Sequence, residues 1–542
     1  MKLFNKFFAV ALGGLLVLSS CETAELDLTS NPNALSPSQA DADFFLNALQ
    51  EDFALWTHNM GNIGAQLTRV SYMSGRTYNN VYSPASLADE WEEAYQDMLQ
   101  DIKLMNALSE NKPYHRGMGK VFQAYIMITL VDYFGNVPDP VTGSALKGDA
   151  EGEVDLNPVE AEGRVVYDNA IKLLQDAKND FAAATTGPAL DFYYNGDASK
   201  WIKAANSILK KIYWTTGNNG AYNGITDYIQ DPADDFRFPW GTNQVQPDTR
   251  HPFYRSNYTA TGGQEYMPHY LIWTMQTGHG AVSDPRLKYY YYRQVEATPG
   301  FGADPDEEVL ECSLENFFNP YGDEWPHCGL PDGYWGRDHG NDNGIPPDGF
   351  LRTLRGVYPA GGRFDDDSFE ATALGGGRGG DGITPIMTSS WMHFMNAHVA
   401  VQSGNVGEAY NQTRAGVEDA LAKVQTLGPA LDERDSSSYL NGLESDWNAA
   451  STAGKLDIWA KQFLISSVGN GNDAYIMYRK TGLPSNIQPN IEDGAAGTRN
   501  AGDFPTLMFY PSNYVSNNSN AQQRSSLTDR PFWMEGVSVD LK

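Results

Sequence analysis

Hydrophobic residues recur at helical spacing in two parts of the chain. Five large apolar residues alternate in steps of four and three, which places them on one face of a helix. They are Trp91, Tyr95, Met98, Ile102 and Met105. The preceding SLAD, residues 86–89, resembles a helix capping box. Residues 118–134 are apolar nearly all round, so we expect a helix that is buried on most sides and ends at Gly135. Further apolar stripes predict helices over 162–184, 198–215, 386–402, 405–426 and 455–468.

The predicted helices follow one another at distances typical of antiparallel helix pairs joined by loops. This spacing favours an all-α scaffold of the tetratricopeptide-repeat (TPR) type, although the pairs do not align to one strict repeat signature. Between residues 218 and 383 the helical pattern disappears, and the sequence becomes rich in Gly, Pro, Asn, Asp and aromatic residues. Irregular insertions of this length are typically functional loops. We therefore expect one domain over 41–542, in which a helical scaffold holds a long, aromatic-rich loop region.

The first residues have the pattern of a secretory signal. Two lysines accompany an apolar run, residues 7–18, which is too short to span a bilayer as a mature helix. The following LSSC is similar to a bacterial lipobox, which predicts that Cys21 is acylated and becomes the new N-terminus. The alternative is an ordinary signal peptide with an incidental thiol. We predict a signal peptide over 1–20 and a flexible, lipid-anchored spacer over 21–40. Several acyl chains on Cys21 would hold the protein at a membrane almost permanently.

The chain is strongly acidic and rich in aromatic residues. It carries 68 acidic and 38 basic residues, a formal net charge of −30, and a polyanion of this size repels the phosphates of nucleic acids. We therefore expect no nucleic-acid partner. A hydrophobic fraction of 41% supports a folded core. Many of the 30 Tyr, 12 Trp and 24 Phe lie in Gly- and Pro-rich stretches, where they cannot all belong to that core.

The chain has three cysteines, and two of them lie close together in the loop region. If Cys21 is acylated, Cys312 and Cys328 remain in an oxidising compartment. A disulfide between them would close a loop worth roughly 3 kcal/mol in the chain-entropy model. We expect this disulfide, and the alternative is two free thiols.

Six stretches occur in an order and spacing that one family shares. They are VDYFGNVPDP (131–140), VVYDNAIKLLQDA (165–177), GDASKWIKAANSILKKIYW (196–214), SDPRLKYYY (283–291), PIMTSSWMHFMNAHVAVQSG (385–404) and FPTLMFYPSNYVSNNSN (504–520). Together with the lipobox they resemble the SusD/RagB family, surface lipoproteins that capture nutrients for TonB-dependent transporters in Gram-negative bacteria. Two positions depart from the family pattern, because His398 and Tyr514 stand where Glu is usual.

The resemblance implies a fold, a location and a partner. The fold would be an all-α core of about four TPR-like helix pairs with a loop-rich half at 218–383. The location would be the cell outer membrane, where the protein is lipid-anchored and exposed at the surface. The partner would be a SusC-like TonB-dependent transporter, over which the lipoprotein sits as a lid, and the role would be non-catalytic.

Aromatic residues in two loop regions are the candidate ligand-binding residues. Sugar rings have apolar faces that stack on Trp and Tyr, and peptides use the same surfaces. The candidates are Arg69, Tyr72 and Tyr78 between the first helices, where the resemblance implies part of the binding face, and Trp273, Trp325, Tyr334 and Trp335 in the irregular half. The alternative for each residue is packing beneath its own loop, but we expect at least two of the group to contact ligand.

An acidic, Gly-rich run forms a weak candidate for calcium binding. DHGNDNG begins at Asp338 and includes Asp342, and Asp348 follows closely. Calcium takes six to eight oxygen ligands in a flexible loop, but the run lacks the bidentate Glu that completes an EF-hand. The alternative is a tight turn in which Asn and Gly adopt left-handed backbone conformations. We expect no obligatory cofactor and leave structural Ca²⁺ as an open interpretation.

The sequence carries no motif typical of catalysis. A G-x-S-x-G elbow and the Gly-Lys-Ser/Thr of a phosphate loop are both missing from it. Pairs of carboxylates could hydrolyse glycosides, but so acidic a chain always brings some pair together. We therefore predict a non-enzymatic surface lipoprotein that binds an oligosaccharide, or a peptide, and delivers it to the transporter. The alternatives are a membrane-anchored glycoside hydrolase and a structural lid with no ligand site.

Overall fold

The computed structural model describes most of the chain. The described residues are 41–143, 155, 157–298, 319–322, 324–327, 330, 332–342, 351–371, 375–494 and 500–542. The signal peptide, the spacer with Cys21, the Cys312–Cys328 pair and Asp348 lie outside these ranges. What the sequence predicts for them stays a prediction.

Helices dominate the described residues, as the hydrophobic pattern predicts. The longer helices are α2 (Ala42–Leu67), α5 (Leu99–Ala107), α6 (Pro113–Phe134), α7 (Gly163–Ala183), α8 (Ala198–Thr215), α11 (His269–Thr277), α13 (Ser389–Gln402), α14 (Val406–Val424), α15 (Glu433–Ala449), α16 (Thr452–Ser466) and α17 (Asn472–Thr481). The short ones are α3 (Tyr78–Val81), α4 (Ala88–Glu92), α9 (Asn219–Gly224), α10 (Pro252–Asn257), α12 (Leu287–Tyr290), α18 (Ile491–Gly494) and α19 (Ser512–Asn517), with a π-helix η1 (Glu93–Met98) and 3₁₀ turns η2 (Pro232–Asp234) and η4 (Phe532–Met534).

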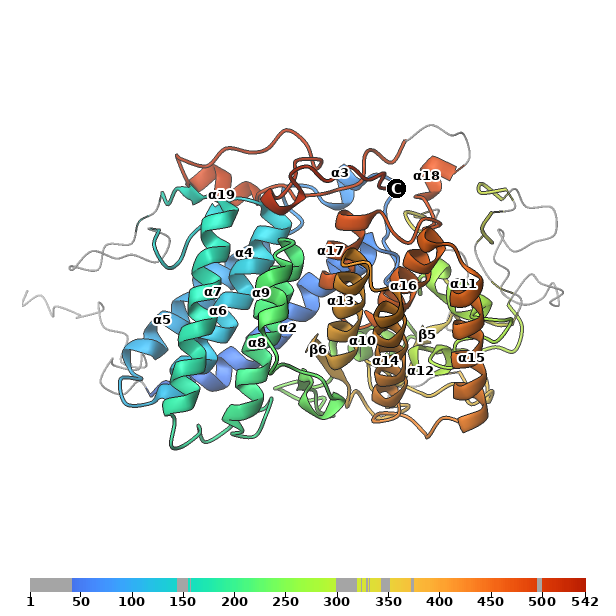
Figure 1. Ribbon diagram of the computed structural model, residues 1–542, viewed down its shortest axis with the longest axis horizontal. Helices are drawn as coiled ribbons and strands as arrows, with labels where there is room; N and C mark the ends of the chain where they lie inside the picture. Colours follow the sequence, from blue (N-terminus) through green and yellow to red (C-terminus); the bar gives the residue numbers. More distant parts are fainter. Residues whose placement is uncertain are drawn as a thin grey trace, which may run out of the picture.

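The helices form two groups that stand side by side (Figure 1). In one group α6 packs on α7 and α7 on α8, and in the other α13 packs on α14 and α16. Helix α2 contacts both α5 and α17, so it joins the two groups. A buried ion pair adds a second link, because Lys211 on α8 lies 2.7 Å from Asp473 on α17 and both side chains are 2% exposed. The predicted all-α class is confirmed.

Helix α8 illustrates how the sequence dictates these elements. The Asp197 carboxylate caps the helix by accepting a hydrogen bond from the backbone N–H of Ser199 at 2.9 Å. The predicted stripe then faces the core along the whole length of the helix. Its residues Trp201, Ala205, Ile208 and Ile212 are all at most 1% exposed. Similarly, α6 ends at the predicted Gly135, which adopts a φ of +74° that favours glycine.

The predicted capping box before α4 is wrong. Leu87 precedes the helix and makes no side-chain cap, and the Ser86 hydroxyl instead donates to the Ser83 carbonyl at 2.8 Å. The serine is therefore used in the preceding turn and is not available to the helix. The apolar stripe that follows is confirmed, since Trp91, Met98 and Ile102 are buried. It runs on through the π-helix η1.

The loop-rich region contains short elements rather than a single irregular coil. Its strands form two-residue to five-residue antiparallel pairs: β3 (Phe236–Pro239) with β6 (Ile383–Met387), and β4 (Tyr291–Tyr292) with β5 (Leu354–Arg355). A third pair, β1 (Val137–Pro138) with β2 (Glu160–Ala161), lies near the end of α6. Residues 500–542, at the red end of the colour range, cross the top of both helix groups (Figure 1). Among the described residues, no helix combines the length and hydropathy needed to cross a bilayer.

Candidate functional site

The two regions that carry the predicted ligand-binding residues lie against each other. The backbone N–H of Gly340 donates to the Met73 carbonyl at 3.0 Å. The Tyr72 hydroxyl donates to the Asn341 carbonyl. The Tyr78 hydroxyl lies 3.1 Å from Nε2 of His339. Two segments that lie some 270 residues apart in the sequence therefore pack against each other, and together they form the candidate site.

Arg69 and Tyr78 lie beneath this surface. Each is 1% exposed. The Arg69 guanidinium donates to the carbonyls of Gln488 at 2.8 Å and Lys542 at 2.9 Å, and also to the Leu67 carbonyl. Its role in the structure is to tie the start of this loop to two distant parts of the chain. That either residue contacts a ligand stays a prediction, and neither presents a surface to one here.

Tyr334 and Trp335 are also buried. The Tyr334 hydroxyl donates to Asp365 at 3.1 Å, and the Arg293 guanidinium lies 4.6 Å from the centre of its ring. Trp335 is 1% exposed and its backbone N–H donates to the Thr353 hydroxyl at 2.8 Å. Both therefore pack under their own loop in this structure, and their contact with ligand is untested.

Tyr72 is the half-buried ring at the centre of the candidate site. It meets Tyr266 edge-to-face, with ring centres 5.7 Å apart and planes at 76°. Two guanidinium groups lie over the Tyr266 ring, Arg352 at 4.2 Å and Arg337 at 4.7 Å. We call these four residues the ring face. Its exposed part is aromatic, because Tyr72 and Tyr266 are half-buried whereas Arg337 and Arg352 are 5% and 8% exposed. An aromatic surface of this kind can stack on a sugar ring or a peptide group.

The sequence reasoning missed three of the four residues of the ring face. Tyr266 lies in the Gly-rich stretch GGQEYMPHY, where an aromatic residue flanked by glycines could have been singled out. Arg337 and Arg352 gave no comparable signal, because an arginine in a loop is normally solvated. Their role emerges only when the tertiary structure stacks them on the same ring.

Trp273 and Trp325 are both close to Asn486, which lines a small cavity. Trp273, half-buried on α11, lines a cavity of about 170 Å³ together with His279, Gln462 and Asn486. The indole N–H of Trp325 donates to the Asn486 carbonyl at 3.0 Å. Trp273 and Trp325 therefore both lie next to Asn486, and Tyr72 does not line this cavity.

The candidate calcium ligands take other partners in the structure. Asp338 is fully buried, and its two oxygens lie 3.1 Å and 2.5 Å from Nδ1 of His269 and His327. The Gln488 amide also donates to it, at 2.9 Å. Asp342 is paired with Arg76 at the surface. Within the described residues no group of three or more His, Cys, Asp and Glu side chains is arranged to hold a metal ion. The calcium interpretation, which also involves Asp348, is therefore untested.

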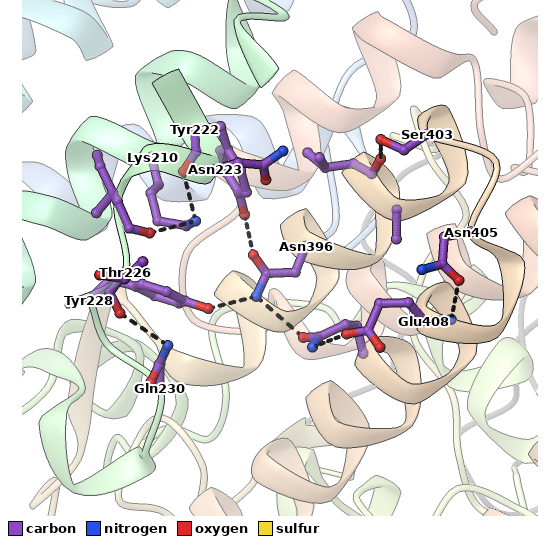
Figure 2. Close-up of a pocket in the computed structure, with 14 residues that line it drawn as sticks. Lys210, Tyr222, Asn223, Thr226, Tyr228, Gln230, Asn396, Ser403, Asn405 and Glu408 are labelled. Carbon is purple, nitrogen blue, oxygen red and sulfur yellow. Dashed lines mark hydrogen bonds between the residues drawn. The ribbon is translucent and has the colours of Figure 1, made fainter. Parts of the chain in front are cut away.

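A larger cavity lies between α8–α9 and α13–α14, and Figure 2 shows its lining. Its volume is about 430 Å³. The Lys210 ammonium lies 3.6 Å from the centre of the Tyr222 ring and 4.3 Å from that of Tyr228, and burial lowers its pKa to about 8. Asn396 bridges the two hydroxyls, accepting from Tyr222 at 2.6 Å and donating to Tyr228 at 3.1 Å. These groups satisfy one another, and none of the predicted ligand-binding residues lines this cavity.

Comparison with known proteins identifies relatives of this arrangement. Residues 32–298 match the model of a SusD-like family described as starch-binding and associating with the outer membrane. A search of curated proteins found no match.

Solved structures share the fold at low sequence identity. A SusD homologue from Bacteroides fragilis is 17% identical, with a TM-score of 0.60 over 91% of this chain and 99% of its own. A SusD/RagB family protein from Bacteroides thetaiotaomicron is 13% identical, with a TM-score of 0.63 over 91% and 99%. A chitin-binding SusD homologue from Flavobacterium johnsoniae is 14% identical, with a TM-score of 0.59 over 90% and 97%. The TPR-like helical fold expected from the sequence is confirmed.

Proposed function

Because the chain belongs to the SusD/RagB family, we propose that it captures an oligosaccharide at the cell surface and delivers it to a SusC-like TonB-dependent transporter. The family is associated with the outer membrane, and its members are binding proteins rather than enzymes. Capture requires stacking surfaces and hydrogen-bond donors but no general acid or base. A peptide is the alternative ligand.

One observation carries the proposal to particular residues. The ring face joins a half-exposed tyrosine, Tyr72, to a second ring that two guanidinium groups hold in place. We propose that a sugar ring stacks on Tyr72, whose neighbour Tyr266 is held by the buried guanidinium groups of Arg337 and Arg352. Trp273, which lines the cavity of about 170 Å³, would contact a more distant sugar unit of the same oligosaccharide.

Calorimetric titration with oligosaccharides tests this assignment. Maltohexaose is one probe, because the family is described as starch-binding, and chitohexaose is another, because relatives of this chain are described as chitin-binding. We expect Tyr72→Ala to weaken binding of the preferred sugar about tenfold, or ~1.4 kcal/mol. Tyr410→Ala, which removes a half-buried tyrosine on α14, is the matched control and should bind like the parent. Equal affinity of the Tyr72 and Tyr410 variants would contradict the site assignment.

Anchoring and partnership have their own tests. We propose that acylation of Cys21 fixes the protein to the outer membrane, so Cys21→Ala should move it from the membrane fraction to the soluble fraction. We further propose that the wild-type chain co-purifies with a TonB-dependent barrel from detergent-solubilised outer membranes. A soluble wild-type protein would contradict the first proposal, and purification without any barrel would contradict the second.

A further inference from the structure

A separate cleft lies between η1, β1 and α19, and it shares no residue with the ring face. Its volume is about 450 Å³, within the range typical of small-molecule sites. One wall consists of three aromatic rings, Trp91, Tyr95 and Tyr514, and polar side chains surround them. The proposed function makes no use of this cleft.

The three rings form a continuous, curved wall. The Trp91 ring lies 5.0 Å from that of Tyr95 and 4.6 Å from that of Tyr514, with planes tilted by 41° and 42°. Trp91 is 5% exposed and forms the base of the wall, while the two tyrosines are half-buried on either side of it. Ring faces inclined in this way can contact an apolar surface from more than one direction.

Hydrogen bonds fix the orientation of both tyrosines. The Tyr95 hydroxyl donates to the Pro138 carbonyl at 2.7 Å. The Tyr514 hydroxyl donates to Glu160 at 2.8 Å and accepts from the Asn518 amide at 3.1 Å. A ligand would therefore meet rings that already have their bound orientation, which reduces the entropy cost of binding.

The polar groups of the cleft favour a neutral, hydroxyl-rich ligand. The amides of Gln96 and Asn517 are exposed at its rim, and each can both donate and accept. Glu92 and Asp155 line the cleft, and Glu160 accepts a hydrogen bond from the Tyr514 hydroxyl. Three carboxylates at this position repel an anionic ligand, such as a phosphate or a uronic acid.

We propose that this cleft is a second ligand site and that it takes a neutral saccharide. The apolar face of the sugar would stack on Tyr514 and Tyr95, and its hydroxyls would bond with the amides at the rim. A second site would let the protein hold a long glycan at two points and gain affinity by avidity.

Ligand-observed saturation-transfer NMR and calorimetry on the purified protein test the proposal. The probes are maltohexaose, chitohexaose and cellohexaose, each titrated to millimolar concentration. Tyr514→Glu removes the ring, and Tyr514→Phe keeps it. The matched control is Tyr410→Glu, the same substitution at a half-buried helical tyrosine that also lies near a tryptophan, with ring centres 5.7 Å apart. Melting temperatures confirm that each variant is folded.

We expect at least one sugar to bind in a manner that Tyr514→Glu weakens at least tenfold, and that Tyr514→Phe and Tyr410→Glu leave within twofold. The binding step that Tyr514→Glu removes should persist in Tyr72→Ala. This result would distinguish binding at the cleft from binding at the ring face. Three outcomes would overturn the proposal: affinity unchanged in Tyr514→Glu, equal loss in Tyr410→Glu, or binding of none of the three sugars. The first leaves the proposed function intact, whereas loss of binding in Tyr514→Glu with none in Tyr72→Ala would contradict only the ring face.

Discussion

Replacing Arg69 with methionine separates a structural role of this residue from contact with ligand. Its guanidinium donates to the carbonyls of Leu67, Gln488 and Lys542. Methionine keeps much of the apolar side chain but leaves the carbonyls without these donors. A hydrogen bond to a charged group contributes ~1.5–3 kcal/mol. Because the three bonds share one side chain, their contributions do not add fully, and we expect the free energy of unfolding to fall by about 4 kcal/mol.

The melting temperature should report this loss. Unfolding entropy is ~2.1 cal/mol/K per residue, or about 1 kcal/mol/K for 542 residues, so we expect a decrease of about 4 °C. The matched control is Arg76→Met in the same segment, because Arg76 is 45% exposed and its ion pairs with Asp342 and Glu492 should contribute less than ~1 kcal/mol.

Differential scanning fluorimetry and urea denaturation measure both variants. Oligosaccharide affinity, determined well below the melting temperature, should change less than twofold in Arg69→Met. A tenfold loss of affinity with an unchanged melting temperature would show that Arg69 contacts ligand, and the structural explanation would be refuted.

Three further predictions follow from buried charges and exposed rings. Lys211→Met should lower the free energy of unfolding by about 3–5 kcal/mol, because it leaves Asp473 buried without its partner, and Lys211→Met/Asp473→Leu should recover much of the loss in the same urea titration. Burial, with added repulsion from neighbouring acids, raises the pKa of Glu93 to about 7. The folded chain therefore binds the proton of the Glu93 carboxyl group more tightly than the unfolded chain does. The free energy of unfolding consequently falls as the pH rises from about 4.5 through 7. Glu93→Gln should therefore raise the melting temperature at pH 8, by an amount equivalent to ~1 kcal/mol after solvent screening, and leave it unchanged at pH 4. A shift of equal size at both pH values would contradict the raised pKa of Glu93. Trp273→Ala should weaken binding of a hexasaccharide more than that of a disaccharide, and calorimetry showing equal effects would contradict a contact with a distant sugar unit.

The hydrophobic pattern located the scaffold because its helices are amphipathic. Helix α8 carries a strict stripe, and its predicted bounds match the observed ones. Helix α15 was missed because it is largely polar and buries only Tyr439, Leu440, Leu443 and Trp447. Helix α11 lies inside the Gly-rich region, where nine residues are too few for a periodic signal.

Burial of the aromatic loops could not be read from the sequence. Composition indicated that some rings must lie outside the core, but which ones depends on contacts between distant segments. Trp325 is covered because residue 486 reaches it, and Arg69 because residues 488 and 542 do. Tyr72 keeps a partly exposed ring, and it meets Tyr266 edge-on across a separation of 194 positions in the sequence. No local pattern records such long-range contacts.

Tyr514 shows the opposite case, in which a local departure carried information. Its replacement of the usual Glu was visible in the sequence, but its consequence was not. The structure places this ring 4.6 Å from Trp91, and so turns a departure from the motif into one wall of a cleft.

Binding and turnover measured in the same sample test most directly whether the protein captures glycans without cleaving them. Purified protein is titrated with maltohexaose and chitohexaose by calorimetry. The solution in the calorimeter is then assayed for reducing ends over several hours. We predict saturable binding of at least one sugar and no increase in reducing ends above the protein-free control. Reducing ends that accumulate in proportion to protein, or the failure of both sugars to bind, would contradict this account.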